Sequence, residues 1–188
     1  MLINIILANV AVGIIGVVGA YSLLSFFVKS RSKIMILVSF AAGSMIAVSF
    51  FDLLPEAIAE HGNTMLMMEY LVLGFVIFLL LEKAFFYYHC HEENCDRHGS
   101  VKLVLIGDTV HNFLDGVAIA ASFLVSPTLG AATTLAIIIH EVPQEVGDMG
   151  VLVHAGYSKG KAIIFNLFSG GFAILGGVLG FYYLNRFE

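Results

Sequence analysis

DTVHNFLDG at residues 108–116 and HEVPQEVGD at residues 140–148 are two polar runs inside otherwise apolar sequence. Between Leu103 and Ser158 the chain carries five acidic residues and no lysine or arginine. One acidic residue at the centre of a membrane helix costs at least about 2.5 kcal/mol, so five of them facing lipid would cost more than about 10 kcal/mol. These side chains must therefore face protein, water or a bound cation.

The composition of the 188 residues is that of a membrane protein. Hydrophobic residues make up 59% of the chain and charged residues only 12%, whereas a soluble domain carries roughly 25% charged residues. The first 28 residues hold no charged side chain and no signal-peptide cleavage pattern, which favours a retained first helix. We expect an all-α polytopic membrane protein with a single transmembrane domain over residues 1–188. Six membrane helices are predicted, at about residues 3–28, 34–54, 65–88, 103–125, 129–154 and 162–185.

The distribution of lysine and arginine predicts the orientation of these helices. With the N-terminus outside, eight of the nine basic residues fall on the inner side and only Arg186 falls outside. We therefore expect an integral protein of the plasma (inner) membrane whose loop at residues 89–102 is cytoplasmic. A tract of histidine and cysteine in this loop is a compositional signal for metal binding, and a disordered polar loop is an equal alternative. Its candidate ligands are His89, Cys90, His91, Cys95 and His98.

Helical geometry gathers each polar run onto one face. At about 100° per residue, four side chains of the first run share a stripe about 100° wide, and five of the second fall within roughly 140°. Pro143 removes one backbone hydrogen bond, which frees a carbonyl oxygen near residue 139 as a further ligand. The two sets are Asp108, His111, Asn112 and Asp115, and His140, Glu141, Gln144, Glu145 and Asp148.

An imidazole and a carboxylate one helical turn apart, as in His111 and Asp115, are a ligand arrangement of metal sites in helical bundles. Two such helices facing each other supply four to six ligands, which suits one or two ions such as Zn²⁺, Fe²⁺ or Mn²⁺. A lone histidine in a membrane helix is usually a hydrogen-bonded packing residue. Here both histidines lie beside acids on neighbouring helices, so packing alone is the weaker hypothesis.

The roles of the peripheral polar residues stay open. Asp108 could cap or hydrate its helix, and Glu145 and Asp148 could orient a histidine that binds metal. His154 lies near the inner end of its helix and suits an interfacial position or a transit ligand equally. Further candidates with a packing or interfacial alternative are Asn166, beside Ser169, and Asp52, beside Glu56 at the outer end of the second helix.

The motifs resemble those of the ZIP family, the zinc/iron-regulated-transporter-like proteins. HNFLDG at 111–116 and HEVPQEVGD at 140–148 are similar to the signatures of that family's fourth and fifth helices, above all in the subgroup reading HExPHExGD. SFFDLLPE at 49–56 is similar to its second helix. The resemblance implies a divalent-metal transporter with two adjacent sites between the fourth and fifth helices. Carried over by position, it implies one ligand set of His111, Asp115, His140 and Gln144 and a second of Asn112, Asp115, Glu141 and Gln144.

Two departures from the family pattern stand out. Gln144 replaces the histidine of the subgroup and the glutamate of other members, and a neutral amide is a weaker ligand than either. The family normally has eight membrane helices, so a chain with six lacks the last two and is either a short form or a fragment.

The predicted function is transport of divalent transition-metal ions, with Zn²⁺ uptake into the cytoplasm first and Fe²⁺, Mn²⁺ or Cd²⁺ as other substrates. The alternatives are a metal-binding membrane sensor or scaffold and an incomplete transporter. A membrane metalloprotease is a distant third, because HEVPQ at 140–144 lacks the second histidine of H-E-x-x-H, and we expect no enzyme. Expected partners are the lipid bilayer, the metal ions and a second copy in a homodimer, without nucleic acid.

Overall fold

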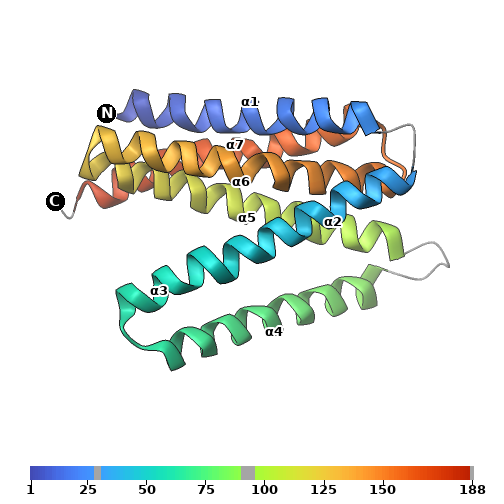
Figure 1. Cartoon of the computed structure of the whole chain (residues 1–188), viewed down its shortest axis with the longest axis horizontal. Helices are drawn as coiled ribbons and strands as arrows, with labels where there is room; N and C mark the ends of the chain where they lie inside the picture. Colours follow the sequence, from blue (N-terminus) through green and yellow to red (C-terminus); the bar gives the residue numbers. More distant parts are fainter. Residues whose placement is uncertain (28–30, 90–95, 187–188) are drawn as a thin grey trace.

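A computed structural model of the chain describes residues 1–27, 31–89 and 96–186. Every regular element in these ranges is helical, which confirms the all-α class (Figure 1). The elements are α1 (Leu2–Phe27), α2 (Arg31–Val48), the π-helical segment η1 (Ser49–Leu53), α3 (Leu54–His61), α4 (Thr64–His89), α5 (Asp96–Val125), α6 (Pro127–His154) and α7 (Lys159–Leu184).

Five stretches of the described residues are long and apolar enough to cross a membrane. They are Leu2–Phe26, Ile34–His61, Thr64–Leu81, Val101–Val125 and Lys159–Leu184. The remaining predicted span corresponds to α6, which has 28 residues but carries the second polar run. Its length suffices for a bilayer about 30 Å thick, while its side chains need the shelter of neighbouring helices.

Four helices, α1, α5, α6 and α7, lie side by side and form the main bundle (Figure 1). α2 packs against α6 and leads through η1 into α3, away from the bundle. α4 returns from there toward α5 as a helix whose most apolar stretch has no buried residue. The two polar runs lie on α5 and α6, so they belong to the bundle rather than to the outlying helices.

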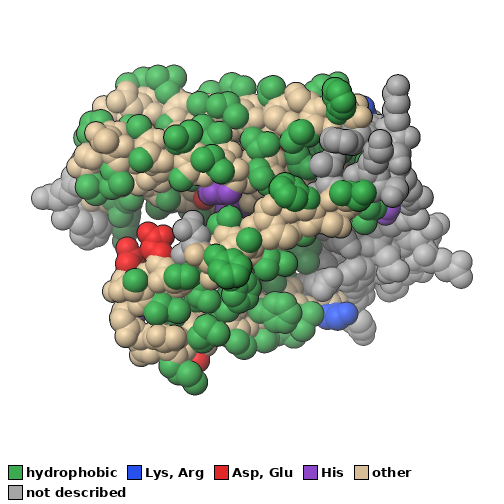
Figure 2. Space-filling model, viewed as in Figure 1, with side chains coloured by type: hydrophobic (Ala, Val, Ile, Leu, Met, Phe, Trp, Pro, Cys, Tyr) green, Lys and Arg blue, Asp and Glu red, His purple; other side chains and the backbone are tan. Residues whose placement is uncertain are grey.

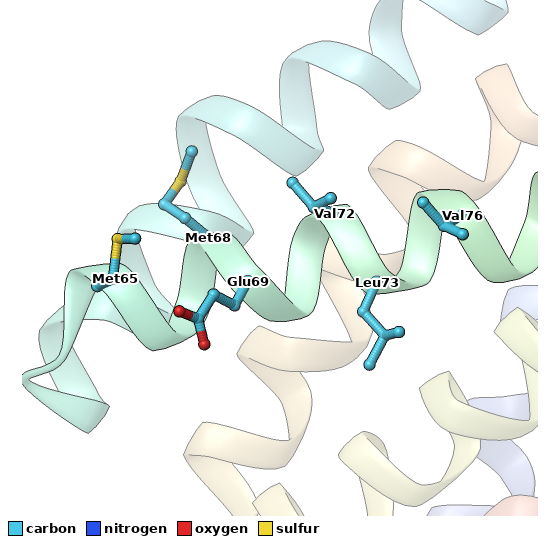
Figure 3. A pocket seen from close by; sticks show the side chains of 6 residues that line it. All are labelled: Met65, Met68, Glu69, Val72, Leu73 and Val76. Carbon is cyan, nitrogen blue, oxygen red and sulfur yellow. The ribbon is translucent and has the colours of Figure 1, made fainter.

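A hollow on the outlying helix α4 has a volume of about 410 Å³ (Figure 3). Its lining is apolar apart from one carboxylate, and it contains none of the predicted metal ligands. The lining residues are Met65, Met68, Glu69, Val72, Leu73 and Val76.

Two apolar clusters stabilise the bundle at separate levels along its length. Along α5 they are separated by residues 102–118, and along α6 by residues 138–145, which include most of the polar side chains. The polar side chains thus lie between two apolar layers, away from both ends of the bundle. One cluster contains Val17, Ala20, Leu24, Ile34, Val101, Val146, Met149, Leu152 and Ala162, and the other Ile5, Val12, Ile119, Ala120, Phe123 and Ile137.

Glycines set how closely the helices approach. A Cβ atom at Gly116 of α5 would overlap the carbonyl oxygen of Ala173 on α7, and one at Gly176 of α7 would overlap that of Phe113. On α1, Gly16 faces Glu145 and Gly19 faces Val142 of α6, as expected for small residues in membrane-helix packing. Backbone contact between α5 and α7 therefore brings the polar side chains of α7 against the first polar run.

At two predicted span boundaries the helix extends further than the predicted span. The second span was expected to end near Leu54, yet the chain stays helical to His61. Pro55 is accommodated because it lies in the first turn of α3, and because the N–H of Leu54 bonds the carbonyl of Ser49 across the π-helical segment. Residues 96–102 were assigned to the loop, but α5 begins at Asp96. Loss of hydropathy marks the edge of the bilayer, whereas a helix can continue beyond it.

Candidate metal centre

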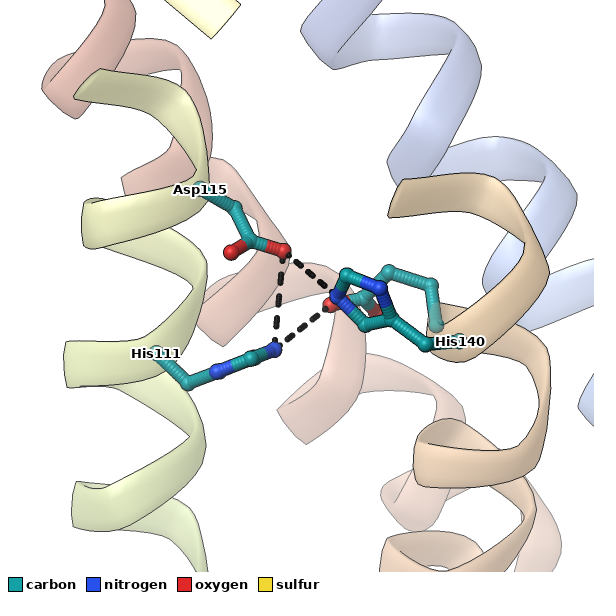
Figure 4. Close-up of side chains that lie close together, drawn as sticks. His111, Asp115 and His140 are labelled. Atoms are coloured by element: carbon teal, nitrogen blue, oxygen red, sulfur yellow. Dashed lines mark hydrogen bonds and ion pairs between the residues drawn. The ribbon is translucent and has the colours of Figure 1, made fainter. Parts of the chain in front are cut away.

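Helices α5 and α6 bring four metal-ligating side chains together. One donor atom from each of His111, Asp115, His140 and Glu141 lies within 4.8 Å of all the others. Figure 4 shows both imidazole rings turned toward the carboxylate of Asp115. The Nε2 atom of His140 lies 3.2 Å and that of His111 3.5 Å from Asp115 Oδ2, and His111 Nε2 lies 3.6 Å from Glu141 Oε1. The predicted stripes on the two helices therefore converge.

These separations suit a small divalent cation. Zinc binds nitrogen and oxygen ligands at about 2.0–2.2 Å in tetrahedral geometry, so neighbouring ligand atoms stand about 3.3–3.6 Å apart. The three measured separations, 3.2 to 3.6 Å, fall close to that range. Two imidazoles and two carboxylates also supply the borderline nitrogen and hard oxygen donors that zinc, iron and manganese accept.

Glu141 is the least compensated member of the cluster. Only 1% of it is exposed, and no described residue donates a hydrogen bond to either of its oxygens. The Nε2 atom of His111 likewise has no hydrogen-bond partner among the described residues. A buried carboxylate is stable only when a proton, a cation or hydrogen-bond donors compensate it. The arrangement can therefore hold a divalent cation, with Glu141 as its most deeply buried ligand.

The cluster keeps a route to the outside of the bundle. His111 is 35% and His140 27% exposed, in contrast to Glu141. Figure 2 shows histidine atoms in a recess between the main bundle and the arm formed by α2 and α3, on a surface otherwise rich in hydrophobic side chains. An ion can thus reach the histidines before it reaches the buried carboxylate.

Asp108, Asn112 and Gln144 form a second polar cluster beside the first. Asp108 Oδ1 accepts hydrogen bonds from Asn112 Nδ2 at 2.9 Å and from Gln144 Nε2 at 3.0 Å. Its Oδ2 accepts a hydrogen bond from the hydroxyl of Ser169 on α7. Two of the six predicted ligands, Asn112 and Gln144, therefore donate hydrogen bonds from their amide nitrogens to Asp108.

The other peripheral candidates are buried but lie outside the four-residue cluster. Glu145 has no hydrogen-bond partner among the described residues on either oxygen, and Asn166 has none on either amide atom. Asp148 Oδ2 and His154 Nδ1 are also buried without a partner there. Glu145 and Asp148 follow Glu141 along α6. They therefore continue the row of acidic residues toward the end of α6 that is predicted to lie on the inner side of the membrane.

Metal binding by the loop at residues 89–102 stays a prediction. Cys90, His91 and Cys95 lie outside the described residues. His89 is the last residue of α4 and His98 lies in the first turn of α5. Asp52 belongs to the π-helical segment η1.

Two buried polar residues of the bundle were not among the predicted ligands. Ser169 contacts Asp108, although the sequence indicated a packing role for it. Asn9 of α1 is 1% exposed, and its Nδ2 donates to the carbonyl of Ile5 at 2.8 Å. An asparagine well inside a mainly apolar first helix is the signal that could have identified Asn9.

Comparisons with known proteins show which family the chain resembles. The family model described as "ZIP Zinc transporter" matches residues 1–104 and 90–185. The zinc transporter ZIP13 of Pongo abelii is 38% identical over 156 residues, which cover 77% of this chain and 45% of the relative. ZIP13 of Homo sapiens is 33% identical over 189 residues, covering 77% and 50%. The zinc transporter ZIP10 of Homo sapiens is 44% identical over 78 residues, covering 42% and 9%.

The family match extends over nearly the whole chain, and the chain spans about half the length of the ZIP13 relatives that it matches. The matched residues include both polar runs and the helices that carry them. On this evidence the chain belongs to the ZIP zinc transporter family.

Proposed function

We propose that the chain carries divalent transition-metal ions across a membrane, with Zn²⁺ as its first substrate. The main support is the cluster of His111, Asp115, His140 and Glu141. One ligand atom from each of these residues lies within 4.8 Å of the others, between two helices of the bundle. The ZIP13 and ZIP10 relatives are named as zinc transporters, which supports zinc over iron, manganese or cadmium.

Transport requires a site that binds an ion and also releases it. The two half-exposed histidines and the buried carboxylate of Glu141 form a graded set of ligands, in which an ion can exchange one partner at a time. Asp115 lies near both histidines and can bridge such steps. Several neighbouring weak positions favour conduction over permanent binding.

A second ion position beside the first is part of the proposal. Asn112 and Gln144 lie on the same helix faces as His111 and His140, and each amide carries one oxygen that can bind a cation. A binuclear site would have Asp115 and Gln144, the two residues common to both predicted ligand sets, between its two positions. Zn²⁺ would enter from the outer side and leave toward the cytoplasm, in the orientation that the basic residues predict. A homodimer stays a prediction.

Two other functions can be distinguished from transport by experiment, because each predicts a different observable result. A metal-binding sensor or scaffold, or an incomplete transporter, would bind zinc at the same residues without moving it across the bilayer. A metalloprotease would cleave a peptide. The second histidine of its H-E-x-x-H motif would fall at residue 144. In this chain that residue is a glutamine, which donates a hydrogen bond to Asp108.

Zinc influx into proteoliposomes that contain the purified 188-residue chain tests the proposal. We expect saturable influx that Asp115→Ala abolishes. The matched control is Leu114→Ala, because Leu114 is next to Asp115 on α5 but is 57% exposed on the surface of the bundle. Zinc bound in stoichiometric amount without influx would replace transport by the sensor or incomplete-transporter function.

A further inference from the structure

One carboxylate holds the amide groups of both Asn112 and Gln144. Asn112 Nδ2 lies 2.9 Å and Gln144 Nε2 3.0 Å from the same oxygen, Asp108 Oδ1. Asn112 Nδ2 also donates to the backbone carbonyl of Asp108 at 3.1 Å, so both of its N–H groups have an acceptor. The hydroxyl of Ser169 donates a hydrogen bond to the second carboxylate oxygen of Asp108. All four side chains are buried, and Asp108 is 4% exposed.

The hydrogen bonds to Asp108 Oδ1 fix which way these amides face. A carboxylate only accepts hydrogen bonds, whereas an amide group donates through its nitrogen and accepts through its oxygen. Both amides must therefore turn their nitrogens to Asp108, which directs their carbonyl oxygens away from it. Only the oxygen of such an amide is a metal ligand, so Asp108 determines what Asn112 and Gln144 offer to a cation.

Along their helices, the residues that carry the two amides are neighbours of the metal cluster. Asn112 follows His111 directly in the chain, and Gln144 lies one turn of α6 after His140 and three residues after Glu141. Asp108, by contrast, already accepts hydrogen bonds from three side chains on α5, α6 and α7. Both of its oxygens therefore have hydrogen-bond donors, whereas neither oxygen of Glu141 receives one from the described residues.

We propose that Asp108 is a positioning residue that presents the carbonyl oxygens of Asn112 and Gln144 to the transported cation and does not itself bind it. The inference rests on the proposed function, because it requires a cation beside the two amides. It assigns different roles to two aspartates of one helix face, with Asp115 as a ligand and Asp108 as the residue that orients ligands.

A single isotope label can report on one of these amides. Gln144 is the only glutamine in the 188 residues, so glutamine labelled with ¹³C at its side-chain carbonyl marks this residue alone. The experiment compares infrared spectra of the purified full chain with and without Zn²⁺. We expect zinc to shift the labelled carbonyl band in the wild-type protein.

Asp108→Asn tests the positioning role. Asparagine offers both a donor and an acceptor, so the neighbouring amides lose their unique orientation. We expect the zinc-induced shift to disappear and the zinc affinity to fall about 10–100-fold, the usual effect of removing a partner that orients a metal ligand. Asp108→Glu keeps a group that only accepts hydrogen bonds, so it should retain the shift. Ser169→Ala leaves both amide hydrogen bonds in place and should retain it too.

The outcomes separate this inference from the proposed function. Zinc binding by the wild type with an unshifted Gln144 band would overturn the inference and leave the metal site standing. A shift that persists unchanged in folded Asp108→Asn would overturn it as well, because a purely structural Asp108 changes stability and not the band. A wild type that binds no zinc would overturn both proposals.

Discussion

Asp108 and Asp115 are the same residue type, lie two turns apart on one face of α5, and have opposite surroundings. Asp108 accepts hydrogen bonds from two amides and a hydroxyl. Asp115 has two imidazole nitrogens within 3.5 Å of one oxygen and is more accessible. The comparison teaches that the partners of a buried acid, more than its sequence motif, indicate whether it is available to a metal ion.

Loss of the Asp115 carboxylate should have the largest effect. We expect Asp115→Ala, and equally His140→Ala, to abolish zinc influx while the protein stays folded, because each removes a donor from the four-residue cluster. Influx in proteoliposomes measures the effect, and Leu114→Ala is the control for a substitution on the same helix turn. Normal influx in folded Asp115→Ala protein would remove the basis for treating the two aspartates differently.

Zinc should also stabilise the folded protein through the Asp115 cluster. At a free zinc concentration 100 times the Kd, binding to the native state alone adds about 2.7 kcal/mol to the free energy of unfolding. Thermal unfolding with zinc and with a chelator measures this difference. We expect the stabilisation in the wild type and in Leu114→Ala and its loss in Asp115→Ala. Equal stabilisation of Asp115→Ala would locate the bound zinc elsewhere.

The contact of α5 with α7 places Ser169 against Asp108, and a single methyl group should disturb it. Because a Cβ at Gly116 would overlap the backbone of Ala173, we expect Gly116→Ala to destabilise the protein by about 1–3 kcal/mol. Gly171→Ala is the matched control, since a Cβ there meets no atom within 4 Å. Thermal unfolding of both variants checks the contrast, and equal stability would argue against the close approach of these helices.

A histidine at position 144 should move the site toward tighter zinc binding. Imidazole is a stronger zinc ligand than a neutral amide, so Gln144→His should raise affinity by up to about tenfold, or about 1.4 kcal/mol. Competition with a zinc-binding dye measures the affinity, and Gln144→Met, which has no strong ligand atom, should weaken it. Unchanged affinity in both variants would place residue 144 outside the site.

The smallest effect is expected from the inner loop. Replacing His89, His91 and His98 together should change the apparent zinc affinity or regulation of transport without abolishing it, because in the sequence these residues precede both polar runs. Zinc-dependent influx measures the outcome. Complete loss of influx in well-folded protein would make the loop part of the transport site.

Periodicity and hydropathy were enough to predict the helices and most of the candidate site. The stripe containing His111 and Asp115 and the facing residues His140 and Glu141 converge as expected, because helical geometry fixes which side chains share a face. The sequence could not show that Asn112 and Gln144 turn their nitrogens to Asp108. That orientation depends on how α5, α6 and α7 pack in space.

The two helices that extend beyond their predicted spans also show what the sequence could not reveal. Hydropathy detects the bilayer and not the hydrogen bonding of the backbone, so the helical residues 96–102 were assigned to a loop. Pro55 was taken as an end because the π-helical segment before it has no sequence signature. The role of Ser169 was also beyond sequence reasoning, since it arises from backbone contact between α5 and α7 at Gly116 and Gly176.

X-ray absorption at the zinc edge of the purified, zinc-loaded chain tests the central claim most directly. We predict a first shell of nitrogen and oxygen atoms at about 2.0–2.2 Å that includes the outer scattering of two imidazole rings. His140→Ala protein loaded under the same conditions should lose one imidazole contribution or bind no zinc. A wild-type shell without imidazole, or one dominated by sulfur, would contradict the assignment of His111, Asp115, His140 and Glu141 as the metal site.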